Sequence, residues 1–91
     1  MFCSICYDIV DDRRRQKVAE VLKDYGARVQ FSVFEANLLS SELEELKSRL
    51  KPLIDLEEDS LRIYPLCSGC VSKVHILGEG SLTQDPDIII V

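Results

Sequence analysis

Hydrophobic positions change their spacing along the chain, and each change marks an expected element. Residues 2–8 form an apolar run with no Gly, Pro or charge before Asp8, which is typical of a buried strand. The next apolar positions are three or four residues apart, which predicts a helix that begins after Asp11 or Asp12. These positions are Val18, Val21, Leu22 and Tyr25. Gly26 then stands where a helix often ends in a left-handed residue.

The following segment alternates between apolar and polar residues, as a strand does. Val29, Phe31 and Val33 share one face of this pattern. The alternation breaks at Phe34. The break predicts two short strands joined by a tight turn or bulge near residues 31–32.

A second helix is predicted from a capping box at residues 41–44, in which a serine hydroxyl and a glutamate carboxylate satisfy free backbone N–H groups. Its apolar stripe is Leu43, Leu46, Leu50 and Leu53. Pro52 ends or bends this helix because it cannot donate a backbone hydrogen bond. The acidic residues 55–59 predict a loop, and residues 61–66 predict a strand. Pro65 places the end of that strand near a sheet edge.

The resulting order is βαββαβ, the split βαβ of the ferredoxin-like fold. This fold has a four-stranded antiparallel sheet with two helices on one face, so we expect an α+β protein. Residues 1–91 are predicted to form a single domain, with the core in 1–66 and a C-terminal extension in 67–91. Two further strand-like segments, 74–77 and 88–91, have no place in the minimal fold. We expect this extension to pair with a sheet edge and to contact the partner subunit of a homodimer.

The composition is that of a folded protein rather than a disordered one. Of 91 residues, 46% are hydrophobic and 30% are charged. A chain this short buries a modest core, which favours a homo-oligomer. No apolar run approaches the ~20 residues of a membrane span, and the first residues lack a charged segment with a cleavage site. We therefore expect a cytoplasmic protein without membrane contact.

The formal charge of −5 argues against broad attraction to nucleic acid, but the charges are unevenly spread. Acids crowd into residues 42–59, whereas five of the eleven cations form a cluster. This cluster is Arg13, Arg14, Arg15, Lys17 and Arg28. We predict one basic patch that binds a nucleic-acid backbone, in which arginine suits bidentate phosphate contacts. Its contact residues are predicted to be Arg14, Arg15, Lys17 and Arg28. The alternative for each cation is a solvated face.

Asp8 is the candidate catalytic and metal-binding residue, because it follows a buried strand at a sheet edge where ligands bind. Mg²⁺, or Mn²⁺ in its place, takes oxygen ligands, but one carboxylate per chain is too few. A twofold axis would supply a second Asp8, and the shared ion would activate water against a phosphodiester. The alternative, equally compatible with the spacing, is that Asp8 and Asp11 only begin the next helix.

The four cysteines form two Cys-x-x-Cys pairs, Cys3/Cys6 and Cys67/Cys70. Together they resemble a four-thiolate zinc site. Residues three apart on a strand point to opposite faces, however, so Cys3 and Cys6 cannot share one ion. The second pair surrounds a glycine and predicts a turn, with metal binding or a labile disulfide as alternatives to a structural role. His75, the only histidine, has no obvious catalytic partner.

Three segments together resemble the CRISPR-associated protein two family, the small subunit of the CRISPR spacer-acquisition machinery. They are Tyr7-Asp8-Ile9, the cationic cluster at 13–17 and the block at 25–35, and the match covers residues 1 to about 66. Residues 62–67 also look like the fourth strand of that family. The resemblance implies a ferredoxin-like homodimer with Asp8 as a magnesium ligand near the twofold axis. It also implies metal-dependent cleavage of RNA or DNA.

Single residues match positions that this family associates with activity or with the dimer cleft. They are Arg15, Lys17, Arg28 and Phe34. Lys17 stands where Arg is common, so bidentate phosphate binding is not available at that position. Tyr7 and Phe34 are interpreted as core or dimer-contact aromatics. The resemblance further implies a partner, a pair of integrase dimers that this protein bridges while protospacer DNA lies across the assembly.

Three functions fit these features. The first is a CRISPR adaptation protein that bridges the integrase subunits and has a magnesium-dependent endonuclease site acting on single-stranded RNA or on duplex DNA. The second is a catalytically inactive scaffold of the integration complex, in which Asp8 fixes local geometry. The third is a toxin-like endoribonuclease of a toxin–antitoxin pair, because related small dimers occur in such pairs.

Overall fold

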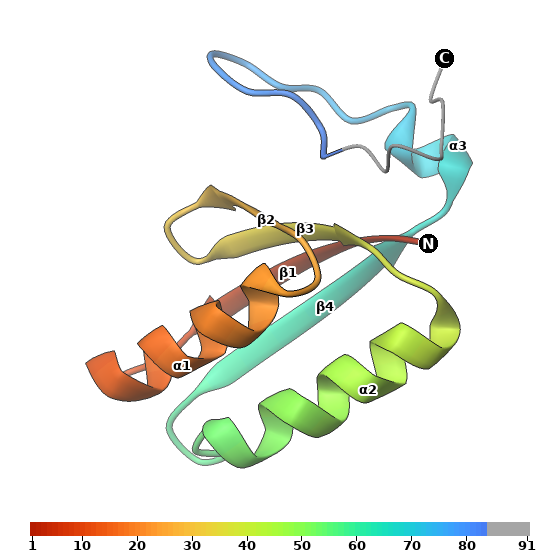
Figure 1. Cartoon of the computed structure of the whole chain (residues 1–91). Helices are drawn as coiled ribbons and strands as arrows, with labels where there is room; N and C mark the ends of the chain where they lie inside the picture. Colours follow the sequence, from red (N-terminus) through yellow and green to blue (C-terminus); the bar gives the residue numbers. More distant parts are fainter. Residues whose placement is uncertain (84–91) are drawn as a thin grey trace.

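Strands and helices follow the predicted order in the computed structural model, which describes residues 1–83 (Figure 1). The elements are β1 (Phe2–Asp8), α1 (Asp12–Lys23), β2 (Ala27–Gln30), β3 (Val33–Asn37), α2 (Ser40–Leu50), the 3-10 turn η1 (Lys51–Leu53), β4 (Ser60–Leu66) and α3 (Ser68–Val71). No helix of the described chain is both long and apolar enough to cross a membrane.

The four strands form one antiparallel sheet in the order β2-β3-β1-β4. Strand β1 lies inside the sheet, with β3 on one side and β4 on the other. Helices α1 and α2 both cover the same face of the sheet (Figure 1). This arrangement is the ferredoxin-like fold and confirms the predicted α+β class.

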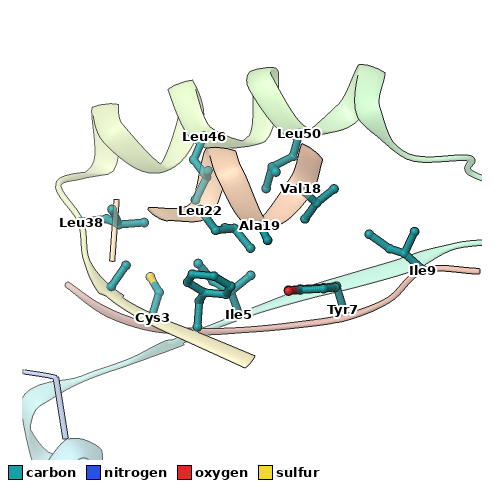
Figure 2. Close-up of a cluster of buried hydrophobic side chains, with 12 residues drawn as sticks. Cys3, Ile5, Tyr7, Ile9, Val18, Ala19, Leu22, Leu38, Leu46 and Leu50 are labelled. Carbon is teal, nitrogen blue, oxygen red and sulfur yellow. The ribbon is translucent and has the colours of Figure 1, made fainter. Parts of the chain in front are cut away.

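The hydrophobic core fills the space between the sheet and the two helices (Figure 2). Strand β1 contributes every second residue to it, because successive side chains in a strand point to opposite faces. Each helix contributes the apolar stripe that its spacing predicts. The largest fully buried side chains are Phe34, Ile5, Leu22, Leu38, Leu46, Val18 and Cys3. The core on one face and the pairing with β3 and β4 along both edges therefore hold β1, the strand that ends at Asp8.

The β2–β3 hairpin confirms the prediction of two short strands, and its turn lies at Phe31 and Ser32. The pairing slips between Arg28 and Gln30, which is the irregularity that the broken alternation indicates. The buried residues of the hairpin are Phe34 and Ala36, whereas Phe31 is 73% exposed. The face predicted for Val29, Phe31 and Val33 is therefore not the one that packs into the core.

Gly26 does not adopt the left-handed backbone that its position suggests, because the positive-φ residues of the described chain are Gly78 and Gly80. Helix α1 ends instead with Asp24 in the right-handed conformation. Glycine is needed at position 26 because β3 passes close by. A Cβ atom there would lie 2.1 Å from the carbonyl oxygen of Glu35, a distance that leaves no room for any side chain.

Helix α2 begins at Ser40, and its N-cap is Leu39. The carboxylate of Glu42 accepts a hydrogen bond from the Leu39 N–H at 2.8 Å. Leucine has no side-chain oxygen to complete a capping box, so the predicted cap at Ser41 is wrong. Pro52 lies in η1 directly after the helix, as expected of a residue that ends one.

The C-terminal extension differs most from the prediction. Residues 67–70, predicted as a turn, include the start of the short helix α3. Residues 74–77, predicted as a strand, have no regular structure. Further along, the Thr83 N–H donates to the carboxylate of Glu35 at 3.0 Å, which ties the extension to β3. The predicted strand at 88–91 lies outside the described residues.

Replacing Gly26 with alanine should destabilise the protein, because the new methyl group would collide with the backbone of β3. Overpacking of this kind costs about 1–3 kcal/mol, and a backbone obstacle cannot rotate away. We expect the urea midpoint to fall accordingly at a fixed protein concentration. Gly69→Ala is the matched control, because a Cβ there would lie 3.9 Å from the Cys67 sulfur, in ordinary contact. Equal midpoints for the two variants would contradict the steric explanation.

Candidate nucleic-acid interface

Asp8 is the last residue of β1, and its side chain is exposed. Its neighbour Tyr7 is buried in the core (Figure 2), so the alternation of the strand places Asp8 on the face that α1 and α2 leave uncovered. Ser60 stands opposite Asp8 in β4. Among residues 1–83, no three acidic, cysteine or histidine side chains are arranged to hold a metal ion. A cation at Asp8 would need further ligands from water or from a second chain.

The carboxylate of Asp59 ties the loop after β1 to the loop before β4, and its side chain is fully buried. It accepts hydrogen bonds from the Arg14 guanidinium at 2.8 Å, the Val10 N–H at 3.0 Å and the Asp55 N–H at 2.9 Å. The Arg14 contact is the largest cause that holds the pKa of Asp59 well below its usual range. These bonds fix the start of α1 relative to the end of β1.

Arg14 is predicted from the sequence as a phosphate ligand, but the structure places it in this internal ion pair. Its Nη2 also lies 3.4 Å from the carboxylate of Glu58, and its side chain is 29% exposed. The guanidinium is therefore occupied by the acids of the loop before β4. The partner Asp59 is 45 residues away in the sequence, so local spacing does not reveal the pair.

Arg15, the next residue of α1, contacts the end of β1 and the β2–β3 turn. Its Nη2 donates to the carbonyl oxygen of Ile9 at 2.9 Å, and its Nη1 pairs with the carboxylate of Asp12. The guanidinium carbon lies 6.0 Å from the centre of the Phe31 ring. At this distance a cation is attracted to an aromatic face. Arg15 therefore links α1 to the hairpin.

Arg28 extends from β2 over the aromatic part of the core. Its guanidinium carbon lies 5.3 Å from the centre of the Phe34 ring, and its Nη2 donates to the Tyr7 hydroxyl at 3.4 Å. Tyr7 and Phe34 are both buried in the single chain, with ring centres 6.3 Å apart. Both aromatics therefore belong to the core of the chain and support Arg28 from there, and their role in a dimer cleft stays a prediction.

A groove of about 570 Å³ lies between α1 and the β2–β3 hairpin. The charged and aromatic residues that line it are Arg13, Arg15, Lys17, Lys23, Arg28, Asp12, Glu20 and Phe31. Both carboxylates pair with groove cations, one with Arg15 and the other with Lys23. The remaining cations form no ion pair within the described chain. The groove therefore carries excess positive charge on a chain whose formal net charge is −5.

Three of the four predicted phosphate ligands meet in this groove. They are Arg15, Lys17 and Arg28. Lys23 is not among the predicted residues, although the helical spacing from Arg13 through Glu20 places it on the same face of α1. Phe31 is also missed, because its alternation with neighbouring valines suggests an ordinary strand residue. An aromatic at a hairpin turn beside a cationic helix is the signal that identifies it.

The cysteines, all of which lie in the described chain, do not form one metal site. Cys3 is buried in the core and Cys6 is half-buried on the other face of β1, as the alternation predicts. Cys67 and Cys70 are exposed at the start of α3. The backbone N–H of Cys70 donates to the Cys67 sulfur and lowers the pKa of that thiol. All four thiols are free.

The fold and the groove define a small ferredoxin-like protein that gathers cations beside a strand with an exposed terminal carboxylate. The model of the family described as CRISPR associated protein Cas2 matches residues 1–74. The chain therefore belongs to the Cas2 family, as the sequence resemblance implies.

Relatives and solved structures agree with this assignment. The chain is 52% identical over 87 residues to CRISPR-associated endoribonuclease Cas2 3 of Synechocystis sp., which covers 96% of this chain and 95% of that protein. It is 48% identical over 81 residues to CRISPR-associated endonuclease Cas2 2 of Thermus thermophilus, covering 89% and 86%. A chain in a partial Cas6-RT-Cas1–Cas2 complex has a TM-score of 0.75 and 30% identity, covering 84% of this chain and 89% of that one.

Asp59→Asn should destabilise the fold at neutral pH, because the amide loses the charge that Arg14 and two backbone N–H groups stabilise. A carboxylate whose pKa is lowered by folding contributes stability above its unfolded pKa of about 3.9. That contribution is lost as the pH falls from there toward the folded pKa. The urea midpoint of the variant should lie below that of the wild type at neutral pH, and the gap should narrow below about pH 4.

Glu58→Gln is the control for this experiment. Its carboxylate is 60% exposed and lies 3.4 Å from Arg14, and exposed pairs contribute little to stability. We expect its urea midpoint to stay close to that of the wild type at every pH. A gap for Asp59→Asn that is unchanged between neutral pH and about pH 3 would refute the role of the charge.

Proposed function

We propose that this Cas2-family chain is a CRISPR adaptation protein that binds nucleic acid in its basic groove and bridges the integrase subunits. The observation that carries the proposal is the gathering of five cations in one groove of an acidic chain. Most of the surface repels a polyanion, whereas the groove attracts one, so charge alone restricts binding to one place. The proposed ligand is the sugar–phosphate backbone of RNA or DNA.

Lys17 and Arg28 are the first phosphate contacts that we propose in the groove. Neither forms an ion pair in the described chain, so neither has to release an acid before it binds. The planar fork of Arg28 suits a bidentate contact, whereas Lys17 supplies a point charge. Arg15 is a third contact, and its bonds to Ile9 and Asp12 orient it before any ligand arrives.

Asp8 is the metal ligand and catalytic residue of the nuclease site in this proposal. Its exposed carboxylate at the end of an inner strand is an oxygen donor of the kind that Mg²⁺ or Mn²⁺ prefers. Because the described chain gathers no cluster of three ligands, we propose that a homodimer brings two copies of Asp8 to one ion. When bound, the ion supplies an activated water and neutralises charge on the phosphodiester.

The relatives support both a nuclease and an assembly role. Two of them are named endoribonuclease and endonuclease, which favours cleavage. The similar chain in a Cas1–Cas2 complex favours assembly with integrase subunits, a role that a nuclease and the second candidate, a catalytically inactive scaffold, would share. The two candidates make different demands on Asp8. A scaffold needs only the shape of the Asp8 side chain, whereas a nuclease needs its negative charge to bind the metal ion.

Asp8→Asn should reduce phosphodiester cleavage about 100-fold or more, because the amide keeps the shape of the side chain but removes an ionised metal ligand. The measurement is cleavage of single-stranded RNA and of duplex DNA with Mg²⁺, with Mn²⁺ and with a chelator. Cleavage by the wild type should also disappear in the chelator. Nucleic-acid affinity without metal and assembly with the integrase should be unchanged.

Glu57→Gln is the matched control for Asp8→Asn, because it neutralises another exposed carboxylate that lies outside β1, in the loop before β4. It should cleave like the wild type. Cleavage that persists in both the chelator and Asp8→Asn would exclude the metal site. In that case, normal integrase assembly would support the scaffold alone.

Lys17→Gln should weaken nucleic-acid binding and flatten its salt dependence, because one phosphate contact is lost. For duplex DNA the slope of log affinity against log salt should change by about 0.9 for each contact removed. Lys47→Gln is the matched control, because Lys47 lies on α2 and pairs with Glu44 at 2.7 Å. Equal slopes for the two variants would show that the groove does not bind phosphates through Lys17.

A further inference from the structure

Phe31 is the most exposed aromatic residue of the described chain, with 73% of its surface accessible compared with 45% for Tyr64. It lies in the turn between β2 and β3 and lines the basic groove. Single exposed apolar side chains are common on protein surfaces, so exposure alone indicates nothing. The contacts that hold this residue in place are more informative.

The turn that carries Phe31 is fastened to β1 beside the candidate metal ligand. The Tyr7 N–H donates to the carbonyl oxygen of Ser32 at 3.1 Å. The Tyr7 hydroxyl donates to the carbonyl oxygen of Phe31 at 3.4 Å. Because Tyr7 is buried and immediately precedes Asp8, these bonds hold the turn at the end of β1.

The ring of Phe31 is also positioned by a cation. The Arg15 guanidinium carbon lies 6.0 Å from the ring centre, and Arg15 is itself held by Ile9 and Asp12. Arg15 therefore limits the orientations available to the ring while most of its surface stays accessible. A flat apolar surface of fixed orientation is what a nucleobase needs to stack.

We propose that Phe31 is a stacking platform for an unpaired nucleobase, and that the groove therefore prefers single-stranded nucleic acid. This inference rests on the proposed binding of nucleic acid in the groove. The base would lie on Phe31 while its neighbouring phosphates contact Lys17 and Arg28. In a duplex, each internal base is already stacked and paired, so only a terminal or displaced base can reach the ring.

The surroundings of Phe31 favour a nucleic acid over a protein as the occupant. The groove that it lines carries five cations and two carboxylates, and both carboxylates are already paired with cations. A polyanion with flat apolar bases satisfies both the charge and the ring. A protein segment would need acidic side chains for the cations and, beside them, an aromatic or apolar side chain for the ring of Phe31. Occupation by a protein is accordingly an outcome that the test must detect.

The absence of tryptophan from the sequence provides a direct probe. Phe31→Trp introduces a single indole whose fluorescence a stacked base should quench. Tyr64→Trp is the matched control, because it places the same probe at an exposed aromatic position of β4 that does not line the groove. Single-stranded DNA and RNA oligonucleotides and a blunt duplex are added to each full-length variant in the presence of a chelator. We expect the single strands to quench the probe at position 31 and not at 64.

Affinities measured by fluorescence anisotropy complete the test. Phe31→Leu keeps an apolar side chain but removes the ring, and it should weaken single-strand binding about tenfold, with less than about a twofold effect on the duplex. The salt slope should stay as in the wild type, because stacking releases no counterions. Phe31→Tyr should bind like the wild type, because it keeps the ring.

The outcomes separate this inference from the proposed function. If Lys17→Gln weakens binding but Phe31→Leu does not, or if the probe at position 31 is not quenched by bound strands, stacking is wrong and the groove proposal stands. If the wild type binds no nucleic acid, both fail. A further outcome is that Phe31→Leu leaves the oligonucleotide affinity unchanged and alters the oligomeric state of the protein or its assembly with the integrase. In that outcome Phe31 is a protein contact, and stacking is again wrong.

Discussion

The buried carboxylate of Asp59 is the interaction on which the geometry of the candidate site depends. It joins the loop that follows β1 to the loop that precedes β4 through one guanidinium and two backbone N–H groups. A buried carboxylate without such partners would be costly, but here each contact favours the charged form. The result is that Asp8 and the start of α1 have a fixed relation, although they belong to different elements.

The two adjacent arginines of α1 show how an acidic chain maintains a basic groove. Arg14 pairs with Asp59 and Glu58 and contributes to the fold. Arg15 is oriented by Ile9 and by Asp12 but still lines the groove. The cations therefore range from structural to accessible, and their number in the sequence overstates the charge that a ligand meets.

Much of the fold follows from the sequence, because the spacing of apolar residues reports which face of each element is buried. The order of β1 to β4 and the stripe of α2 follow from this spacing. The reason for Gly26 and the partner of Arg14 do not, because each depends on a residue that is distant in the sequence. The short helix α3 was also missed, because a glycine between two cysteines suggests a turn.

The sequence predicts the kind of site, a basic patch beside an exposed carboxylate, but only some of the residues that form it. The end of β1 and the cationic start of α1 are local features, so Asp8, Arg15 and Lys17 could be identified. Phe31 was missed because its alternation with Val29 and Val33 suggests a strand residue, whereas it lies in the turn between β2 and β3. Tyr7 and Phe34 satisfied a hydrophobic pattern that is the same for a core residue and for an interface residue.

The close passage of Gly26 has a consequence for how the groove receives a ligand. The helical wall and the strand wall are joined there by residues 24–26 alone, and a chain of this length spans at most ~3.6 Å per residue. At the other end, the hairpin turn is bonded to Tyr7. The separation of the two walls is therefore restrained at both ends. Such a preformed cleft loses little entropy on binding, and it selects a polyanion by its width because it does not adapt to the ligand.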